Sequence, residues 1–277
     1  RCALLKGLDV SVMQEIAGGI ALLDVAVSLA EAAEAGHYCR PVIDESTHLL
    51  VREGRHPVVE VGMPGKFVPN DLELSSEGDQ ILIITGANMA GKSTYMRAAA
   101  LVAIMAQAGS FVPAAYARIG VVDRVFTRVG AFDDLASGQS TFLVEMIELA
   151  NILNNVTGRS LVILDEIGRG TSTLDGLSIA RAVLEFLHGR KSRGPRTLFA
   201  THFHELVTFE GEFSRAKNFH FAAKDTGKEV VFLRKIIPGA TDKSYGIHVA
   251  TLAGVPRRVT DRAREILEEM SEAKHTS

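Results

Sequence analysis

A loop of nine residues, GANMAGKST, carries the groups best suited to binding a phosphate. Gly86 and Gly91 let the backbone curl so that successive N–H groups point inward, and a helix beginning near Lys92 adds its positive N-terminal end. The Lys92 ammonium can pair with β- and γ-phosphates, and the Ser93 hydroxyl can ligate Mg²⁺. The apolar stretch ILIIT before the loop favours this phosphate cradle over a glycine-rich turn without a ligand. The residues predicted to contact the ligand here are Gly86, Ala87, Asn88, Met89, Ala90, Gly91, Lys92, Ser93 and Thr94.

Further along the chain, the apolar stretch SLVIL ends in an acidic pair, Asp165 and Glu166. Asp165 would hold Mg²⁺ directly or through water, and Glu166, one residue further, could accept a proton from an attacking water. Such a pair can also be a solvent-exposed strand end, but phosphoryl transfer needs a cation, a hydroxyl and a carboxylate together, and all three are present. The predicted catalytic residues are therefore Lys92 and Glu166, and the predicted metal ligands are Ser93 and Asp165.

His202 follows the apolar stretch TLFAT, at the end of a predicted strand. Ligands of α/β proteins bind at the carboxyl ends of the strands, so His202 could hydrogen-bond a γ-phosphate and is a third catalytic candidate. The alternative is a histidine that is structural or simply exposed.

Alternating buried strands and helices must position these residues. This alternation predicts an α/β fold with a largely parallel central sheet and an antiparallel edge formed by FHFAA and EVVFLRKII. Upstream, the short stretches HLLV, PVVEVG and DLEL predict a small antiparallel sheet. The predicted helices lie near residues 92–108, 141–154 and 176–188, and the predicted strands of the central sheet at 81–85, 121–129, 161–164 and 197–201.

Both ends of the chain have helical patterns. Residues 1–36 predict an amphipathic helix, or a pair of helices broken at Gly18-Gly19. The tail predicts helices near 245–253 and 257–272, and the stretch RKSRGPR predicts a solvated, mobile loop. The predicted division is a helical segment over 1–45, the main domain over 46–240 and a C-terminal segment over 241–277.

Composition excludes several classes of protein. The 30 basic and 33 acidic residues give a net charge of −3, which excludes a globally basic nucleic-acid binder. The two cysteines form no CxxC motif, so neither a disulfide framework nor a zinc site is expected. No unbroken apolar run reaches the ~18–20 residues of a membrane helix, and the first ten residues do not resemble a signal peptide, so we expect a cytoplasmic protein. Because the chain begins at Arg1, we also expect it to be a piece of something longer.

Taken together, the motifs GANMAGKST, DDLASGQSTFLVEM, LVILDEIGRGTSTLDG and ATHFHEL resemble the ATPase domain of the MutS family of DNA mismatch repair proteins. EGRHPVVE, FVPNDLEL and DKSYGIHVATLAGVP extend the resemblance over nearly the whole chain. It implies a P-loop ABC-type ATPase fold with an antiparallel β subsheet, a short N-terminal helical segment from the helical core, and a C-terminal helix-turn-helix. It also implies ATP or ADP with Mg²⁺, a homodimer joined through the ATPase domain and the C-terminal helices, mismatched double-stranded DNA contacted by domains absent here, and a downstream MutL-type partner.

The resemblance implies roles for individual residues. Phe67 matches the aromatic side chain that stacks on adenine, although a core phenylalanine is the alternative. Asn88 matches an asparagine near the γ-phosphate, and Ala87 departs from the usual proline. Ser140 matches a serine that reaches the nucleotide of the opposite subunit, and it could also be a helix N-cap. Arg234 lies where some relatives place a second side chain beside adenine.

The leading functional prediction is an ATPase domain that hydrolyses ATP at composite sites in a dimer and drives clamp movements on mismatched DNA. One alternative is a nucleotide-gated dimerisation module with negligible turnover in isolation, and another is an ABC-type ATPase of DNA recombination. The Phe-x-Glu triplet at Phe203-His204-Glu205 is expected to serve helix packing, so this chain should not recognise mismatches itself. Any DNA contact should be weak and salt-sensitive, through Arg190, Lys191, Arg193 and Arg196.

Overall fold

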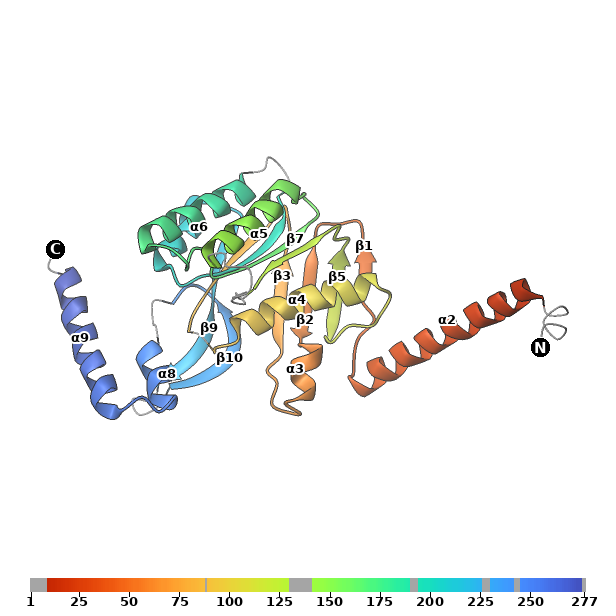
Figure 1. Cartoon of the computed structure of the whole chain (residues 1–277), viewed down its shortest axis with the longest axis horizontal. Helices are drawn as coiled ribbons and strands as arrows, with labels where there is room; N and C mark the ends of the chain where they lie inside the picture. The colour runs from red at the N-terminus through yellow and green to blue at the C-terminus, as the bar shows by residue number, and fades with distance from the viewer. Residues whose placement is uncertain are drawn as a thin grey trace.

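The computed structural model describes residues 9–87, 89–129, 141–189, 194–225, 230–241 and 245–275, and its centre is a six-stranded sheet in the order β10-β9-β4-β8-β7-β6 (Figure 1). All neighbouring strands are parallel except β9 and β10, which are antiparallel. The predicted parallel sheet with an antiparallel edge is therefore confirmed. The strands are β4 (Ile81–Thr85), β6 (Val125–Arg128), β7 (Leu161–Asp165), β8 (Arg196–Ala200), β9 (Ala216–Asp225) and β10 (Val230–Pro238).

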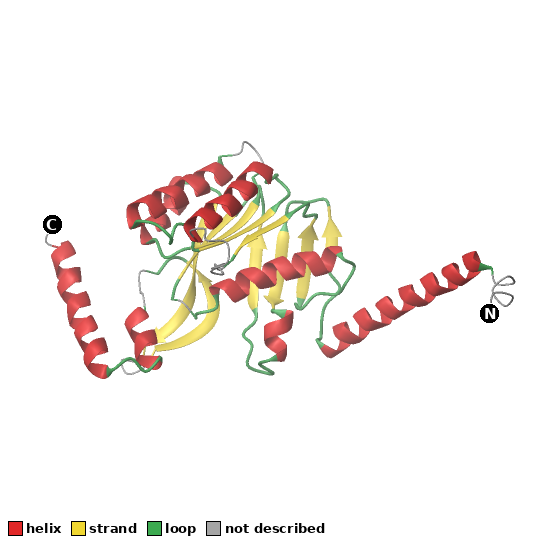
Figure 2. Cartoon of the chain, in the orientation of Figure 1, coloured by secondary structure: helices red, strands yellow, loops and turns green. Residues whose placement is uncertain are grey.

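Helices cover both faces of this sheet (Figure 2). Every residue of β4 is buried, and successive side chains enter two different cores, as expected for a strand covered on both sides. On one face, Leu82 and Ile84 pack with α4 (Lys92–Gln107). On the other, Ile81 and Ile83 pack with α5 (Thr141–Asn155) and α6 (Thr173–His188). The three predicted helices are confirmed.

A second, four-stranded sheet has the order β1-β5-β2-β3. Its strands are β1 (Val42–Asp44), β5 (Tyr116–Gly120), β2 (Leu49–Gly54) and β3 (Asn70–Leu74). β2 is antiparallel to both of its neighbours, whereas β1 and β5 are parallel. Buried residues of β2 and β3 share a core with α4 and with Leu82 and Ile84 of β4, so this helix packs against both sheets.

The strand predicted at PVVEVG is wrong, because Pro57–Val61 forms the short helix α3. His56 caps it, since its Nδ1 accepts hydrogen bonds from the N–H groups of Val58 and Val59 at 3.3 and 3.4 Å. Pro57 occupies the first turn, where its missing N–H costs nothing. The cap and the proline therefore outweigh the strand preference of the valines.

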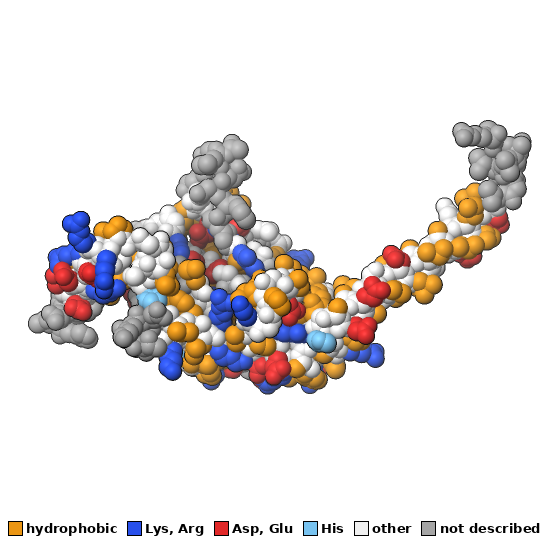
Figure 3. Space-filling view, turned by 90° about the horizontal axis from the view of Figure 1, so that it is seen from below, with side chains coloured by type: hydrophobic (Ala, Val, Ile, Leu, Met, Phe, Trp, Pro, Cys, Tyr) orange, Lys and Arg blue, Asp and Glu red, His pale blue; other side chains and the backbone are white. Residues whose placement is uncertain are grey.

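The N-terminal helix α2 (Val10–Ala35) extends away from the rest of the molecule (Figure 1). It continues through Gly18-Gly19, so the predicted break is wrong; two exposed glycines cost a helix only ~1 kcal/mol each. Ala33 is its one buried residue, and apolar side chains run along the exposed helix (Figure 3). By length and composition alone α2 could cross a membrane, although charged residues such as Asp24 and Glu31 interrupt its apolar runs, as expected from the sequence.

The chain ends in two further helices, α8 (Gly246–Leu252) and α9 (Arg257–His275), as predicted. Between β8 and β9 lie the 3₁₀ turn η1 (His204–Thr208) and α7 (Phe209–Glu212). Phe203 precedes η1 and packs against the core formed by β7 and α6, which fits the packing role expected for the Phe-x-Glu triplet.

Arg196 overturns part of the prediction of a solvated loop. Its side chain is fully buried, and the guanidinium donates to the carbonyl oxygens of Gly120, Val121 and Arg159 at 2.9, 3.1 and 2.5 Å. Burial lowers the pKa of Arg196 to about 10. Arg196 thus ties β8 to the end of β5 and cannot contact DNA, while residues 190–193 lie outside the described part of the chain.

Candidate active site

The loop GANMAGKST, which is predicted to bind phosphate and is called the phosphate-binding loop below, lies at the carboxyl end of β4 and runs into α4. Gly86 and Gly91 have φ angles of +121° and +116°, in the region that favours glycine. A Cβ atom on Gly91 would lie 3.3 Å from the ring of Phe221, so this glycine also permits close packing. Ala87 and Ala90 are buried, and the alanine that replaces the usual proline therefore packs into the core. Asn88 lies outside the described residues.

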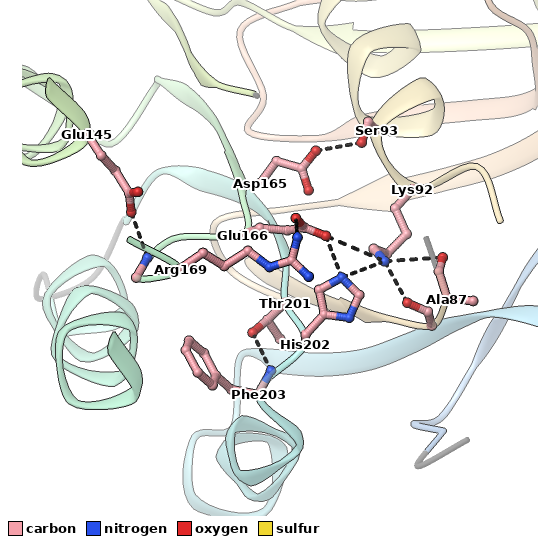
Figure 4. Close-up of polar contacts among 12 residues, drawn as sticks. Ala87, Lys92, Ser93, Glu145, Asp165, Glu166, Arg169, Thr201, His202 and Phe203 are labelled. Carbon is pink, nitrogen blue, oxygen red and sulfur yellow. Dashed lines mark hydrogen bonds and ion pairs between the residues drawn. The ribbon is translucent and has the colours of Figure 1, made fainter. Parts of the chain in front are cut away.

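Lys92 is the buried cation of the site, with 4% of its surface exposed. Its Nζ donates to the carbonyl oxygens of Gly86 and Ala87 at 2.6 and 3.3 Å. It also lies 3.5 Å from Nε2 of His202 and 4.0 Å from Oε1 of Glu166 (Figure 4). Burial lowers the pKa of Lys92, while the nearby carboxylates oppose that shift. The three predicted catalytic side chains therefore meet at one point.

The two predicted metal ligands are in direct contact. Oγ of Ser93, in the first turn of α4, donates to Oδ2 of Asp165, at the end of β7, at 2.6 Å (Figure 4). Burial raises the pKa of Asp165, although the hydrogen bond from Ser93 partly opposes this. A hydroxyl and a carboxylate are hard oxygen ligands, and Mg²⁺ commonly uses one or two of them together with water and phosphate oxygens. The chemistry of this pair therefore fits Mg²⁺.

Both the backbone and the side chain of Glu166 are held by hydrogen bonds. Its φ angle is +59°, and its N–H donates to the carbonyl oxygen of Ala200 on β8 at 2.9 Å. Its carboxylate contacts Nε2 of His202 through Oε1 and Nη1 of Arg169 through Oε2. Burial raises the pKa of Glu166, but the hydrogen bond to His202 and the positive charges nearby outweigh it and leave the pKa lowered. Glu166 is therefore kept as a carboxylate, the form that can accept a proton.

Arg169 and Glu145 also contact this region, and neither was among the predicted site residues. Arg169 lies three positions after Glu166, a spacing that signals a possible ion pair. Glu145 lies among the apolar positions of α5, and the sequence pattern gives no sign that it is buried. It is buried, and its Oε1 accepts a hydrogen bond from the N–H of Gly168 at 2.6 Å. Gly168 has a φ angle of +89°, and a Cβ atom on it would lie 2.6 Å from the carbonyl oxygen of Gly176 in α6.

A cavity of about 250 Å³ adjoins the loop. Phe67 and Arg234 both line it, as do Gly91 and Thr94 of the phosphate-binding segment and the exposed Met89. The cavity is large enough for a flat ring system, and aromatic and guanidinium groups are suited to stack on one.

Asn70 holds together two segments that line this cavity. Its Nδ2 donates to the carbonyl oxygens of Val68 and Arg234 at 3.1 and 2.9 Å, and its Oδ1 accepts from the N–H of Ile236 at 2.8 Å. Arg234 has a φ angle of +54° and lies where the pairing of β10 with β9 shifts register. Asn70 therefore fixes an irregular turn that places Arg234.

Ser140 lies outside the described residues, and α5 begins at Thr141. Neither its predicted contact with a partner's nucleotide nor its alternative role as an N-cap is tested by the geometry.

Comparisons with known proteins identify the family to which the chain is similar. The family model of MutS domain V matches residues 82–271. The DNA mismatch repair protein MutS of Methanosarcina mazei is 65% identical over 258 residues, which cover 93% of this chain and 29% of that protein. The protein of the same name from Methanosarcina acetivorans is 64% identical over the same coverage. That of Ruminiclostridium cellulolyticum is 59% identical over 96% of this chain and 30% of its own length. The chain thus spans under a third of the length of these curated relatives.

Proposed function

The chain belongs to the MutS family, in which it corresponds to domain V, the ATPase region, and from this premise we propose that it binds ATP with Mg²⁺ and hydrolyses it. The observation that carries the proposal is the convergence of a buried lysine, a hydroxyl–carboxylate pair and a second carboxylate at the ends of β4, β7 and β8. Phosphoryl transfer requires this combination of groups.

Each group has a proposed role. The loop N–H groups and Lys92 bind the β- and γ-phosphates, and Phe67 and Arg234 flank the adenine in the adjoining cavity. Ser93 and Asp165 would hold Mg²⁺, which neutralises charge on the phosphates. Water attacks the γ-phosphorus, Glu166 takes the proton from that water, and the bond to the β-phosphate oxygen breaks to release ADP. His202 and Arg169 orient the Glu166 carboxylate.

We further propose that the active form is a homodimer with composite sites. Exposed apolar side chains on α9, among them Val259, Ile266 and Met270, support docking of the C-terminal helix-turn-helix onto a second subunit. Ser140 would complete the nucleotide site of the partner. We propose the same division of the chain as above: a helical segment over 1–45, the ATPase domain over 46–240 and the C-terminal helix-turn-helix over 241–277.

The function of the longer protein is also a proposal. By analogy with the relatives, ATP turnover would drive clamp movements on mismatched double-stranded DNA, which parts outside this chain would contact. A MutL-type factor would act downstream, and the protein would work in the cytoplasm. Family membership disfavours the alternative of a recombination ATPase.

Turnover of ATP by the purified chain tests the proposal. Wild-type protein should hydrolyse ATP in the presence of Mg²⁺, and Glu166→Gln should reduce turnover by ~10²–10⁴-fold while ATP binding is retained. Lys92→Ala should lose most ATP affinity in calorimetry while remaining folded. Negligible wild-type turnover combined with ATP-dependent dimerisation would favour the nucleotide-gated module, and unchanged binding by Lys92→Ala would contradict the assignment of the site.

A further inference from the structure

We infer that Glu145 is a positioning residue for hydrolysis: it fixes the loop that follows Glu166 through a hydrogen bond to the backbone at Gly168. The inference rests on the proposed ATPase function. It concerns a residue on α5 that does not touch the phosphate-binding loop or the cavity beside it, and that reaches the reaction only through Glu166.

The first observation is a buried carboxylate aimed at the backbone. Glu145 is 7% exposed, which is unusual for a glutamate, and its Oε1 lies 2.6 Å from the N–H of Gly168. Figure 4 shows Glu145 reaching from α5 to the loop beside Arg169. Gly168 is two positions after Glu166 and one before Arg169, so the contact restrains the segment that carries both partners of their ion pair.

The second observation is the charge that balances Glu145. Arg128, at the end of β6, is also buried, and its Nη2 lies 3.9 Å from Oε2 of Glu145. Nε of the same guanidinium lies 2.8 Å from Oε2 of Glu148, one turn further along α5. β6 pairs directly with β7, the strand that ends at Asp165. The Glu145 carboxylate is therefore carried by helix α5 and paired with an arginine at the end of strand β6. Helices and strands position a site more rigidly than loops do.

The third observation is that the loop has little room to move at this point. Because any Cβ atom on Gly168 would collide with Gly176, the loop lies directly against the first turns of α6. Glu166 is fixed on its other side by the hydrogen bond from its N–H to Ala200. Loss of the contact from Glu145 would release one of these restraints, so the Glu166 carboxylate would spend less time where it can take the proton.

This arrangement predicts a loss of turnover without a loss of binding. The groups proposed to bind ATP are Lys92 and Ser93 of α4, Asp165 at the end of β7, Arg234 of β10 and Phe67, which precedes β3. In the described structure, Glu145 contacts Gly168 and Arg128 instead. Glu145→Ala should therefore lower kcat by about 10- to 100-fold and leave KM for ATP within about twofold of wild type. Glu145→Gln keeps an oxygen that can accept from Gly168 and should recover most of the lost kcat.

Glu148→Ala is the matched control, because Glu148 lies on the same helix and pairs with the same arginine but is half exposed. Among the described residues it forms no hydrogen bond to the loop that follows Glu166. Its kcat should stay within about threefold of wild type. Wild type and Glu166→Gln belong in the same series: if wild type does not turn over, the proposed function fails, and if it does, the Glu145 variants test the inference alone.

Hydrogen exchange at the Gly168 amide gives a second readout that needs no turnover. Protection should be strong in wild type, retained in Glu145→Gln and lost in Glu145→Ala, each judged against unchanged protection in the core strand β4. The inference is overturned if Glu145→Ala keeps wild-type kcat. It is also overturned if the glutamine variant loses as much as the alanine variant, or if Gly168 is equally protected in all three proteins. If Glu145→Ala does not fold, the test rests on Glu145→Gln, with Glu148→Ala as its control. A Glu145→Gln protein whose kcat is reduced tenfold or more and whose Gly168 amide is unprotected would overturn the inference. A kcat and a Gly168 protection close to those of wild type would support it.

Discussion

The hydroxyl of Ser93 donates a hydrogen bond of 2.6 Å to the carboxylate of Asp165, and so joins the first turn of α4 to the last residue of β7. The contact places a hydroxyl oxygen and a carboxylate oxygen, the two proposed Mg²⁺ ligands, side by side. Burial of Asp165 raises the pKa of its carboxyl above the ordinary value of 3.8, which makes its availability to a cation depend on pH.

Mg²⁺-dependent binding should therefore weaken in acid. Protonation removes the charge of Asp165, and because its pKa is raised, the loss should begin at a higher pH than for an exposed aspartate. The measurement is calorimetry of a non-hydrolysable ATP analogue with Mg²⁺ between pH 7.5 and about pH 5. Asp165→Asn should bind at least ~10-fold more weakly in Mg²⁺ and lose this pH dependence. Asp261→Asn, on exposed α9, serves as the control; full hydrolysis in excess chelator would contradict the metal assignment.

Glu166 should stabilise the fold at neutral pH. Its folded-state pKa lies below the ordinary value of 4.5, so the carboxylate contributes stability above that pH and loses the contribution as the pH falls through the folded pKa. Glu166→Gln should thus unfold at lower urea concentration than wild type at pH 7, with a difference that shrinks below about pH 4.5. Glu268→Gln, an exposed change on α9, provides the control. If the difference in stability between wild type and Glu166→Gln grew as the pH fell, the pKa of Glu166 would not be lowered in the folded protein.

Phe67 should contribute to binding of the base and not of the phosphates. Phe67→Ala should weaken ATP binding by about 1–3 kcal/mol, the range for loss of one aromatic–base stack. Inorganic triphosphate should bind wild type and variant equally, because the phosphate-binding loop is unchanged. Phe111→Ala, which removes an exposed ring that does not line this cavity, should leave both affinities unchanged. Equal losses for ATP and triphosphate would favour a core role for Phe67.

Arg196 should be essential for stability. Arg196→Ala would leave three carbonyl oxygens without this donor, one of them in a buried hydrogen bond and two in partly buried ones. An unsatisfied buried group costs about 1–3 kcal/mol, and the cavity left by the side chain adds to this, so a loss of about 3 kcal/mol is expected in urea unfolding. Arg52→Ala is the matched control: Arg52 pairs with Asp71 and Glu73 on the surface, and such pairs contribute about 1 kcal/mol or less. Similar losses for the two variants would contradict the role assigned to Arg196.

Mixed dimers should show whether Ser140 acts across the interface. With Ser140→Ala and Glu166→Gln on the same chain, each composite site carries one defect and both sites fail. With the changes on different chains, one site carries both defects and the other is intact, so about half of the activity survives if the sites are independent. Equal rates in the two arrangements would mean that Ser140 does not act in the partner's site.

Much of the candidate site could be predicted because its signals are local. The phosphate-binding loop, the pair Asp165-Glu166 and His202 each follow a short apolar strand, and the parallel sheet then brings the ends of those strands together. Phe67 needed the resemblance as well, since its own sequence context does not distinguish a cavity wall from a core residue.

The missed features depend on partners distant in the sequence. Nothing near Arg196 indicates that carbonyl oxygens of Gly120 and Arg159 converge on it, so it was placed with the exposed basic residues. Glu145 is distinguished from a solvated helix residue by the N–H of Gly168, 23 positions away, and by the buried guanidinium of Arg128 on β6. At α3, the valines favour a strand, and the cap supplied by His56 decided the outcome.

The contact between Gly168 and Gly176 has a consequence for how this region can diverge or be engineered. Neither position can gain a side chain while the other keeps its place, because a Cβ atom on either one meets the backbone of the other. A single substitution at either glycine should therefore destabilise the protein, and a second substitution at the other glycine cannot restore the lost stability. In a chimera that combines β7 from one relative with α6 from another, the two glycines should behave as one inherited unit, and libraries that randomise either position should return glycine.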